Sequence, residues 1–464
     1  MGEAVEKRNG ARIVERGRRI HFIGVGGVGM YSLARLAIEG GASVSGSDRA
    51  NGRLLEDLAS RGAFVYSGSD IGAITDVDEV VYSLAVAEDD AELKFAIEAE
   101  KRVLSRAEYL GKIMQGYREK IGVCGSHGKS TVSAMVSHIL SAVGKDPTSS
   151  IGAPLGDGLP FRAGGREMLV FEACEYRDSF LKLYPDTVCA TNLELDHTDY
   201  FKDLDAMKRS FLMFMNRAEE RVILNEDDAA LSSLIPLIDP EIVRVGTCTT
   251  ARYRYLPNDF SNDGITYSFF KDNILKGRFR LPLIGDFNLT NAALAIATAA
   301  ELGVSVEECG SSLESFRGIG RRMEKIGAVG KSDIIYDYAH HPTEIRAVID
   351  ALRLKYGSVC VIFKPHTYTR TRDLWWDFVS ALSLADVALI TDIYAAREAP
   401  IDGITAERLA EAIGEGAAAV PDREAARIAL GYGFGAIAIM GAGDNSAVLR
   451  AFFPKSLDNR QKMM

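Results

Sequence analysis

The chain has 464 residues, and at roughly 150 residues per domain this length predicts about three domains. With 47% hydrophobic and 25% charged residues, the composition is that of a globular protein with enough apolar material for several cores. The formal net charge of −10 leaves no basic surplus to neutralise phosphates, which argues against a nucleic-acid-binding function.

The six cysteines are scattered and form no C-x-x-C pair, which predicts buried free thiols in a reducing compartment rather than disulfides or a cysteine zinc site. No apolar run reaches the length that spans a bilayer. The N-terminal stretch E-K-R-N-G-A-R-I-V-E-R-G-R-R is charged and contains no apolar secretory segment, so we expect a solvated arm. These features predict a cytoplasmic protein with no membrane partner.

A first α/β unit is predicted over residues 1–117. A strand at 19–24 leads into G-V-G-G-V-G at 24–29, a helix to about residue 39 and a second strand that ends near Asp48. Glycines in such a turn let the backbone approach a diphosphate, and Asp48 is placed to bond a ribose hydroxyl. NAD and a nucleotide-sugar both satisfy this pattern. A strand at 77–83 and the segment at 102–110 complete the unit, and 115–120 is predicted to be a linker.

The second unit, residues 118–318, begins with I-G-V-C-G-S-H-G-K-S-T at 121–131. A strand, a glycine turn and a helix N-terminus together favour phosphate, while a Lys adds charge and a hydroxyl can bind Mg²⁺. The full G-x-x-x-x-G-K-[ST] pattern would require glycine where Val123 stands. We expect ATP at this loop; the alternative is a strand-to-helix turn with an incidental Lys.

Strands predicted at 168–171 and 187–191 are followed by Glu172 and by N-L-E-L-D-H, which ends at His197. Because ligands of parallel sheets lie beyond the carboxyl ends of strands, Ser130, Glu172 and His197 are candidate Mg²⁺ ligands. A first-turn helix acid and a surface histidine are the respective alternatives. A strand at 221–225, antiparallel strands within 250–281 and a helix at 291–302 follow.

A hinge at 316–324 precedes a third α/β unit, residues 319–464, with strands beginning near 334, 359, 387 and 436. This unit contains Asp337, Tyr338 and His340, and the run H-T-Y-T-R-T-R at 366–372. An Arg after a strand suits carboxylate recognition, although a helix-surface salt bridge is equally compatible with the pattern.

A diphosphate turn, an ATP loop and a carboxylate-recognising unit indicate an enzyme that activates an acid with ATP and joins it to an amine. The motifs resemble those of the Mur ligase family of peptidoglycan synthesis, and most closely its L-alanine-adding branch. They are H-F-I-G-V-G-G-V-G-M at 21–30, S-G-S-D at 45–48, G-S-H-G-K-S-T at 125–131, E-A-C-E-Y at 172–176, T-N-L-E-L-D-H at 191–197, G-x-x-N at 285–288, G-R-R-M-E at 320–324, D-Y-A-H-H-P-T-E at 337–344, P-H-T-Y-T-R-T at 365–371 and G-A-G-D at 441–444.

The resemblance implies a three-domain α/β fold: a Rossmann-like N-terminal domain for a UDP-sugar, a P-loop ATPase-like central domain and a Rossmann-like C-terminal domain for the amino acid. It assigns the UDP-sugar to Gly24, Gly26, Gly27, Val28, Gly29, Asp48, Ser83 and Arg106. It assigns ATP to Gly125, Ser126, His127, Gly128, Lys129, Ser130, Thr131, Asn288, Arg322 and Asp337. The amino acid is assigned to Tyr338, His340, His366 and Arg370, catalysis to Lys129, Glu172 and His197, and two Mg²⁺ ions, replaceable by Mn²⁺, to Ser130, Glu172 and His197.

The implied reaction joins L-alanine to the lactyl carboxylate of UDP-N-acetylmuramate through an acyl phosphate, in a monomer or weak homodimer. Cys174 and Thr367 depart from the family pattern, since many members carry Asp and Arg at these places. Three alternatives remain: a ligase that recycles a murein tripeptide onto the same UDP-sugar, an NAD-dependent dehydrogenase and a non-catalytic nucleotide-sugar sensor.

Overall fold

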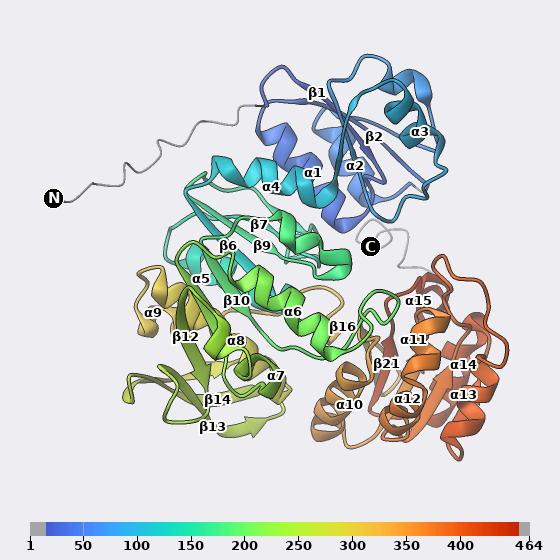
Figure 1. Ribbon diagram of the computed structural model, residues 1–464. Helices are drawn as coiled ribbons and strands as arrows, with labels where there is room; N and C mark the ends of the chain where they lie inside the picture. The colour runs from blue at the N-terminus through green and yellow to red at the C-terminus, as the bar shows by residue number, and fades with distance from the viewer. Residues whose placement is uncertain (1–14, 50, 454–464) are drawn as a thin grey trace.

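The computed structural model of the protein describes residues 15–49 and 51–453, which form three sheets that follow one another along the chain. Figure 1 shows the blue N-terminal part at the top, the green and yellow central part below it, and the orange C-terminal part beside the central one. Residues 6–14 of the predicted N-terminal arm lie outside the described residues. Within the described ranges, no helix is long and apolar enough to cross a membrane.

The N-terminal part is a parallel sheet with helices on its faces. Its strands are β1 (Arg19–Ile23), β2 (Ser43–Asp48), β3 (Phe64–Ser67), β4 (Glu79–Tyr82) and β5 (Arg102–Ser105), and its helices are α1 (Val28–Glu39), α2 (Arg53–Ser60), α3 (Ala91–Glu98) and α4 (Arg106–Ile113). The strand order β3-β2-β1-β4-β5 reverses direction between β1 and β4. Such a switch point is where open α/β sheets bind ligands, so the β1–α1 turn lies at the expected binding edge.

The central part is a ten-stranded mixed sheet. Its strands are β6 (Glu119–Cys124), β7 (Thr148–Ser150), β8 (Phe161–Arg162), β9 (Met168–Glu172), β10 (Thr187–Ala190), β11 (Arg221–Asn225), β12 (Glu241–Gly246), β13 (Tyr253–Ser261), β14 (Gly264–Lys271) and β15 (Ile274–Leu281). Its helices are α5 (Lys129–Ala142), α6 (Leu204–Met215), α7 (Ala229–Ser232), α8 (Asp286–Glu301) and α9 (Val306–Leu313). Strand β6 lies between β9 and β10, parallel to both, and β13–β15 form the antiparallel strands predicted within 250–281.

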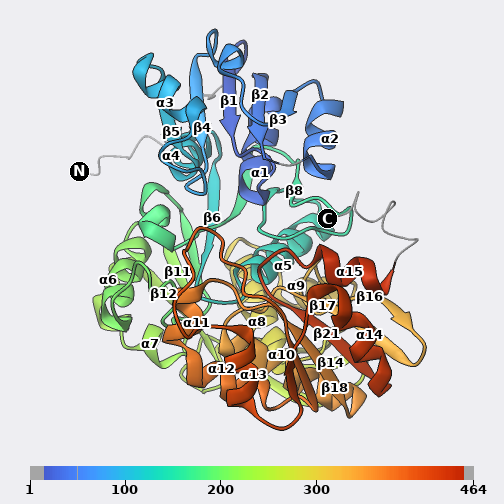
Figure 2. The same cartoon turned by 90° about the vertical axis from the view of Figure 1, so that its right-hand side faces the viewer.

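The C-terminal part has six strands in the order β16-β17-β21-β18-β19-β20. These are β16 (Glu324–Val329), β17 (Ser332–Asp337), β18 (Val359–Phe363), β19 (Val387–Ile390), β20 (Ala417–Ala419) and β21 (Ala436–Met440). The helices are α10 (Pro342–Tyr356), α11 (Tyr368–Asp373), α12 (Trp375–Leu382), α13 (Ala406–Ile413), α14 (Asp422–Tyr432) and α15 (Ser446–Phe452). Figure 2 shows this part in front of the central helices α5 and α8.

Three local predictions are wrong. The linker predicted at 115–120 ends early, because β6 begins at Glu119 and the buried Lys120 ammonium lies 2.7 Å from the Asp186 carboxylate. The helix predicted from residue 291 begins at Asp286. The hinge predicted at 316–324 ends in β16, an edge strand that pairs antiparallel with β17 and that was not predicted. The prediction of free thiols is confirmed, since all six cysteines are unpaired and four of them are buried.

Candidate active site between three domains

The β1–α1 turn gathers the residues predicted to hold the UDP-sugar. Gly24 has φ of +81°, a conformation in which a side chain would be strained. The Asp48 carboxylate accepts a 2.8 Å hydrogen bond from the Gly26 N–H. A Cβ atom placed on Gly29 would lie 3.1 Å from the Arg106 guanidinium, and one on Gly24 would lie 3.4 Å from Ser83. Backbone, carboxylate and guanidinium therefore surround one turn, which suits a diphosphate and a ribose.

The predicted phosphate loop connects β6 to α5. Gly125 and Gly128 have φ of +145° and +81°, so both positions need glycine. Position 128 also has no room for a side chain, because a Cβ atom on Gly128 would lie 2.6 Å from the Asn291 amide oxygen. Lys129 is the first residue of α5, so the loop presents its ammonium and the helix N-terminus together.

The Lys129 ammonium is bound within the protein. It donates to the Ser126 carbonyl at 3.1 Å and to the Glu175 carboxylate at 2.9 Å. Burial would lower the pKa of Lys129, but Glu175, together with Cys174 and Glu172, outweighs burial and raises it, so the ammonium stays charged. The His197 imidazole lies 3.8 Å from the same Glu175 oxygen. The structure thus brings together Lys129 and His197 through Glu175, a residue that was not among the predicted site residues.

Two of the three donors predicted for Mg²⁺, Ser130 and Glu172, fit that ion chemically. Ser130 is buried in the first turn of α5, and Glu172 ends β9 directly beside β6, where it pairs in register with Val123. The Glu172 carboxylate accepts a hydrogen bond from the Gly152 N–H. Nearby, the second carboxylate oxygen of Glu175 is buried without a hydrogen-bond partner among the described residues. Hydroxyl and carboxylate oxygens are the hard ligands that Mg²⁺ prefers.

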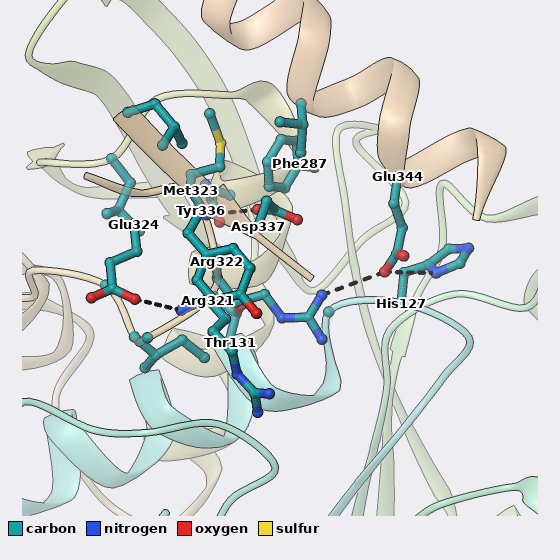
Figure 3. A pocket seen from close by; sticks show the side chains of 18 of the residues that line it. His127, Thr131, Phe287, Arg321, Arg322, Met323, Glu324, Tyr336, Asp337 and Glu344 are labelled. Atoms are coloured by element: carbon teal, nitrogen blue, oxygen red, sulfur yellow. Dashed lines mark hydrogen bonds and ion pairs between the residues drawn. The ribbon is translucent and has the colours of Figure 1, made fainter. Parts of the chain in front are cut away.

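A cavity of about 1520 Å³ lies against the loop and is lined by residues of all three parts of the chain. The N-terminal part contributes Gly26, Gly27 and Val28, and the central part contributes His127, Gly128, Thr131 and Asn288. The C-terminal part contributes Arg322 and Asp337, which Figure 3 shows beside Tyr336 and Phe287. A space of this size admits a nucleotide together with part of a second substrate.

Asp337 is buried at the end of β17 and accepts 2.6 Å hydrogen bonds from the backbone N–H groups of Met323 and Ala339. Burial raises the pKa of Asp337 to about 6, although Arg322 and the two N–H groups oppose the shift. The carboxylate is therefore mostly ionised at neutral pH and can accept a further hydrogen bond from a ligand hydroxyl.

The C-terminal part closes over the phosphate loop through Glu344 of α10. One oxygen of this carboxylate lies 3.2 Å from His127 Nδ1 and 3.5 Å from the Arg322 guanidinium (Figure 3). Burial would raise the pKa of Glu344, but the cationic His127 and its other neighbours hold it well below the usual range. A charged network therefore joins the loop to the C-terminal part.

The residues predicted to bind the amino acid form a second contact between the same two parts. The Arg370 guanidinium bonds Asp196 at 2.6 Å and the His366 ring at 3.1 Å. The His340 ring centroid lies 6.0 Å from that of His366 and 5.3 Å from that of Tyr338. Burial, reinforced by Arg370, lowers the pKa of His340 to about 3 and that of His366 to about 4, so both imidazoles are neutral.

Comparison with known proteins identifies the family. The model of the Mur ligase family catalytic domain matches residues 19–118, that of the Mur ligase middle domain matches 123–299, and that of the Mur ligase glutamate ligase domain matches 321–443. A UDP-N-acetylmuramate–L-alanine ligase of Lachnospira eligens is 39% identical over 85% of this chain and 87% of its own. The chain belongs to the Mur ligase family.

Further relatives and solved structures are similar to this Mur ligase over most of their length. A UDP-N-acetylmuramate–L-alanine ligase of Clostridium acetobutylicum is 37% identical over 85% of this chain and 87% of its own. The crystal structure of the UDP-N-acetylmuramate–alanine ligase of Thermotoga maritima superposes with a TM-score of 0.80 at 24% identity, covering 95% of this chain and 99% of that one. A murein peptide ligase of Psychrobacter arcticus gives 0.72 at 24% identity, covering 94% and 98%. These structures confirm the predicted three-domain Mur ligase fold.

Several residues of this Mur ligase site were not predicted. Glu175 and Glu344 lie inside the motifs E-A-C-E-Y and D-Y-A-H-H-P-T-E, so both residues belong to motifs that the sequence analysis recognised, but neither was given a role there. Asp196 and Glu194 lie in T-N-L-E-L-D-H, but their partners Arg370 and Thr343 are 174 and 149 residues away along the chain. No spacing rule connects groups that meet only when two domains dock.

Proposed function

We propose that the protein joins L-alanine to the lactyl carboxylate of UDP-N-acetylmuramate, with cleavage of ATP to ADP and phosphate, in peptidoglycan precursor synthesis. The observation that carries the proposal is a phosphate loop, with Lys129 and Ser130 in the first turn of its helix, at a cavity shared by all three domains, in a chain 36–39% identical to several UDP-N-acetylmuramate–L-alanine ligases. The arrangement gives the two substrates and the nucleotide a common space.

The proposed roles follow the three domains, with boundaries at about residues 117/118 and 318/319. The β1–α1 turn, Asp48, Ser83 and Arg106 hold the UDP-sugar. The loop at 125–131 holds the ATP phosphates through its backbone N–H groups, and Asn288, Arg322 and Asp337 hold the rest of the nucleotide. Tyr338, His340, His366 and Arg370 receive the amino acid.

The chemistry requires a poor electrophile, a carboxylate, to be activated. Phosphoryl transfer to the lactyl carboxylate gives an acyl phosphate, the neutral amine of L-alanine attacks its carbonyl carbon, and phosphate leaves. Lys129 exchanges Glu175 for the β- and γ-phosphates and offsets the negative charge of the transferring group. Mg²⁺, held by Ser130, Glu172 and His197 at two sites, would supply further charge neutralisation, and Mn²⁺ can replace it.

The amino-acid pocket contributes positioning. Arg370 exchanges part of its contact with Asp196 and His366 for the alanine carboxylate, which its planar fork suits. The neutral rings of His340 and His366 accept hydrogen bonds without adding positive charge beside an ammonium. Docking of the C-terminal domain over the loop excludes water, which would otherwise hydrolyse the acyl phosphate.

ATP and UDP-sugars are cytoplasmic metabolites, so the proposed reaction places the protein in the cytoplasm with small-molecule substrates as its partners. We further propose that it acts as a monomer or weak homodimer.

The test is phosphate release from ATP and Mg²⁺ with UDP-N-acetylmuramate, adding L-alanine, glycine, L-serine or the tripeptide L-alanyl-γ-D-glutamyl-meso-diaminopimelate in turn. We expect strong stimulation by L-alanine. Stimulation by the tripeptide alone would make the protein a recycling ligase. No release with any of the four would refute the ligase function and leave a nucleotide-sugar sensor.

A further inference from the structure

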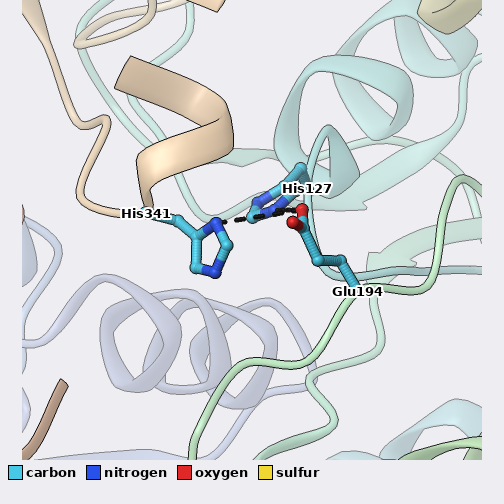
Figure 4. A group of neighbouring side chains, drawn as sticks. All are labelled: His127, Glu194 and His341. Atoms are coloured by element: carbon cyan, nitrogen blue, oxygen red, sulfur yellow. Dashed lines mark hydrogen bonds and ion pairs between the residues drawn. The ribbon is translucent and has the colours of Figure 1, made fainter. Parts of the chain in front are cut away.

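Three side chains with metal-ligating atoms meet where the C-terminal domain docks on the phosphate loop: His127, Glu194 and His341 (Figure 4). His127 belongs to the loop, Glu194 to the segment after β10, and His341 is the N-cap residue of α10. We call these residues the docking triad. It shares no residue with the proposed Mg²⁺ donors Ser130, Glu172 and His197.

The spacing of the docking triad suits a tetrahedral ion. The Glu194 carboxylate lies 3.1 Å from His127 Nε2 and 3.8 Å from His341 Nδ1, and the three ligand atoms all lie within 4.8 Å of one another. Ligands at about 2.0–2.2 Å from a tetrahedral Zn²⁺ are roughly 3.3–3.6 Å apart. Small side-chain rotations therefore bring the three atoms to ligand distance of one ion.

The groups behind the docking triad orient it as the outer shell of a metal site does. Glu344 lies 3.2 Å from the other nitrogen of the His127 ring, the carboxylate–histidine pair that fixes a ligating tautomer. The second oxygen of Glu194 accepts a 2.6 Å hydrogen bond from the Thr343 hydroxyl. The His341 side chain is 3% exposed; its Nδ1 atom accepts a 3.4 Å hydrogen bond from the Thr343 N–H, which keeps that nitrogen free of a proton, and its Nε2 atom has no hydrogen-bond partner among the described residues.

The charge around the docking triad also favours a cation. The Glu194 and Glu344 carboxylates lie 3.1 Å and 3.2 Å from the two nitrogens of the His127 ring, so two negative charges flank the docking triad. Two imidazoles and one carboxylate form a donor set that Zn²⁺ accepts and that Mg²⁺, which prefers oxygen, does not.

We propose that the docking triad binds Zn²⁺, and that the bound ion holds the C-terminal domain on the phosphate loop. The ligands come from both domains, so the site is complete only in the docked arrangement. An ion bound here restrains the loop that must rearrange around the ATP phosphates. Zn²⁺ is therefore expected to inhibit the enzyme by stabilising the closed, nucleotide-free form.

The primary test measures binding and does not depend on the proposed ligase activity. Zn²⁺ is titrated into the nucleotide-free full chain, in excess Mg²⁺, against a chromophoric chelator, and Co²⁺ is used in parallel for the visible absorption of a tetrahedral site. We expect one ion per chain, with affinity at least tenfold lower in His341→Asn and Glu194→Gln. Asn is a good N-cap, so His341→Asn keeps the start of α10.

Two controls make the result specific. His138→Asn removes a histidine of α5 that bonds the Ser312 carbonyl, away from the docking triad, and should leave Zn²⁺ affinity unchanged. His197→Asn removes a proposed Mg²⁺ donor and should also leave it unchanged. Equal affinity in the parent and His341→Asn, or loss of the ion in His197→Asn, would overturn the site.

The restraint is tested separately by thermal unfolding of the same proteins. Zn²⁺ should raise the Tm of the parent and of His138→Asn, and should leave that of His341→Asn unchanged. In the phosphate-release assay, Zn²⁺ should slow the parent more than His341→Asn at the same Mg²⁺–ATP concentration. Equal Tm shifts, or equal inhibition, in the parent and His341→Asn would overturn the proposed link between ion binding and domain docking.

Discussion

Lys129, 17% exposed, and the buried Glu175 form an ion pair at the phosphate loop, and Lys129→Ala separates its contribution to stability from its contribution to catalysis. Glu175 is 1% exposed, holds the Lys129 ammonium at 2.9 Å, and has a second oxygen without a hydrogen-bond partner among the described residues. Removing one partner of a buried ion pair costs about 3–5 kcal/mol, because the remaining charge is uncompensated. At roughly 2–4 °C per kcal/mol for a domain of this size, Lys129→Ala should lower Tm by about 6–20 °C.

The same substitution should stop the reaction for a separate reason. The ammonium is the point charge proposed for the β- and γ-phosphates, and losing one such group in phosphoryl or acyl transfer costs about a hundredfold or more in kcat. Binding of the UDP-sugar should survive, because its proposed contacts belong to the N-terminal sheet. If Lys129→Ala abolished UDP-sugar binding as well as the reaction, the assignment of the UDP-sugar and ATP to separate domains would be wrong.

The double variant Lys129→Ala/Glu175→Gln distinguishes the two effects. Neutralising Glu175 removes the stranded charge, so most of the lost Tm should return, while phosphate release with L-alanine should stay abolished. The assays are differential scanning calorimetry and phosphate release on the parent, both single variants and the double variant. Recovery of activity in the double variant would refute the role of Lys129 at the phosphates.

Three further predictions concern other parts of the site and the N-terminal domain. Arg370→Ala should raise the KM for L-alanine about tenfold or more, which corresponds to the loss of one charge-assisted hydrogen bond. The control Arg372→Ala, at an exposed residue of the same helix, should leave the KM unchanged. A change in kcat alone would contradict the assignment of Arg370 to the amino-acid pocket. Gly26→Ala places a Cβ atom 2.8 Å from the Asp48 carboxylate and should weaken UDP-sugar binding about tenfold by calorimetry, with Gly52→Ala, which meets no atom within 4 Å, as the matched control. Burial would raise the pKa of Glu92, but the His21 ring 3.5 Å away and hydrogen bonds from Ser47, Tyr66 and the Asp70 N–H lower it from 4.5 to about 2. Its contribution of about 3 kcal/mol is therefore present above pH 4.5 and lost as pH falls toward 2, and urea unfolding of Glu92→Gln should lack this acid-sensitive part.

Most of the fold class could be predicted from the motifs, because each motif is formed by residues that are neighbours in the sequence. A strand, a glycine turn and a helix at 19–39 and again at 121–142 are specified by neighbouring residues, through apolar periodicity and the positive φ of Gly24, Gly125 and Gly128. The buried strand β11 was predicted at the bounds that the structure has, and β21 at the residue where it begins. The order of these motifs along the chain made the resemblance to the family specific, and the family comparisons confirm it.

Polar segments were less predictable from the sequence. Glu119 and Lys120 resemble a linker in composition, and they form a strand because Asp186, on a distant segment, neutralises the buried ammonium of Lys120. Strand β16 lies at the sheet edge and carries the charged residues typical of edges, so it lacked the apolar signal of the interior strands.

Contacts between domains depend on how rigid units dock, and no local pattern encodes docking. The Asp196–Arg370 pair, the Glu344 bridge from His127 to Arg322, and the docking triad all join the central and C-terminal domains across more than a hundred residues of chain. The residue types of the active site follow from the sequence, since phosphate, carboxylate and metal chemistry each restrict the choice of side chain. Which of these groups neutralise one another follows from the packing of the domains, because electrostatic partners are set by distance in space.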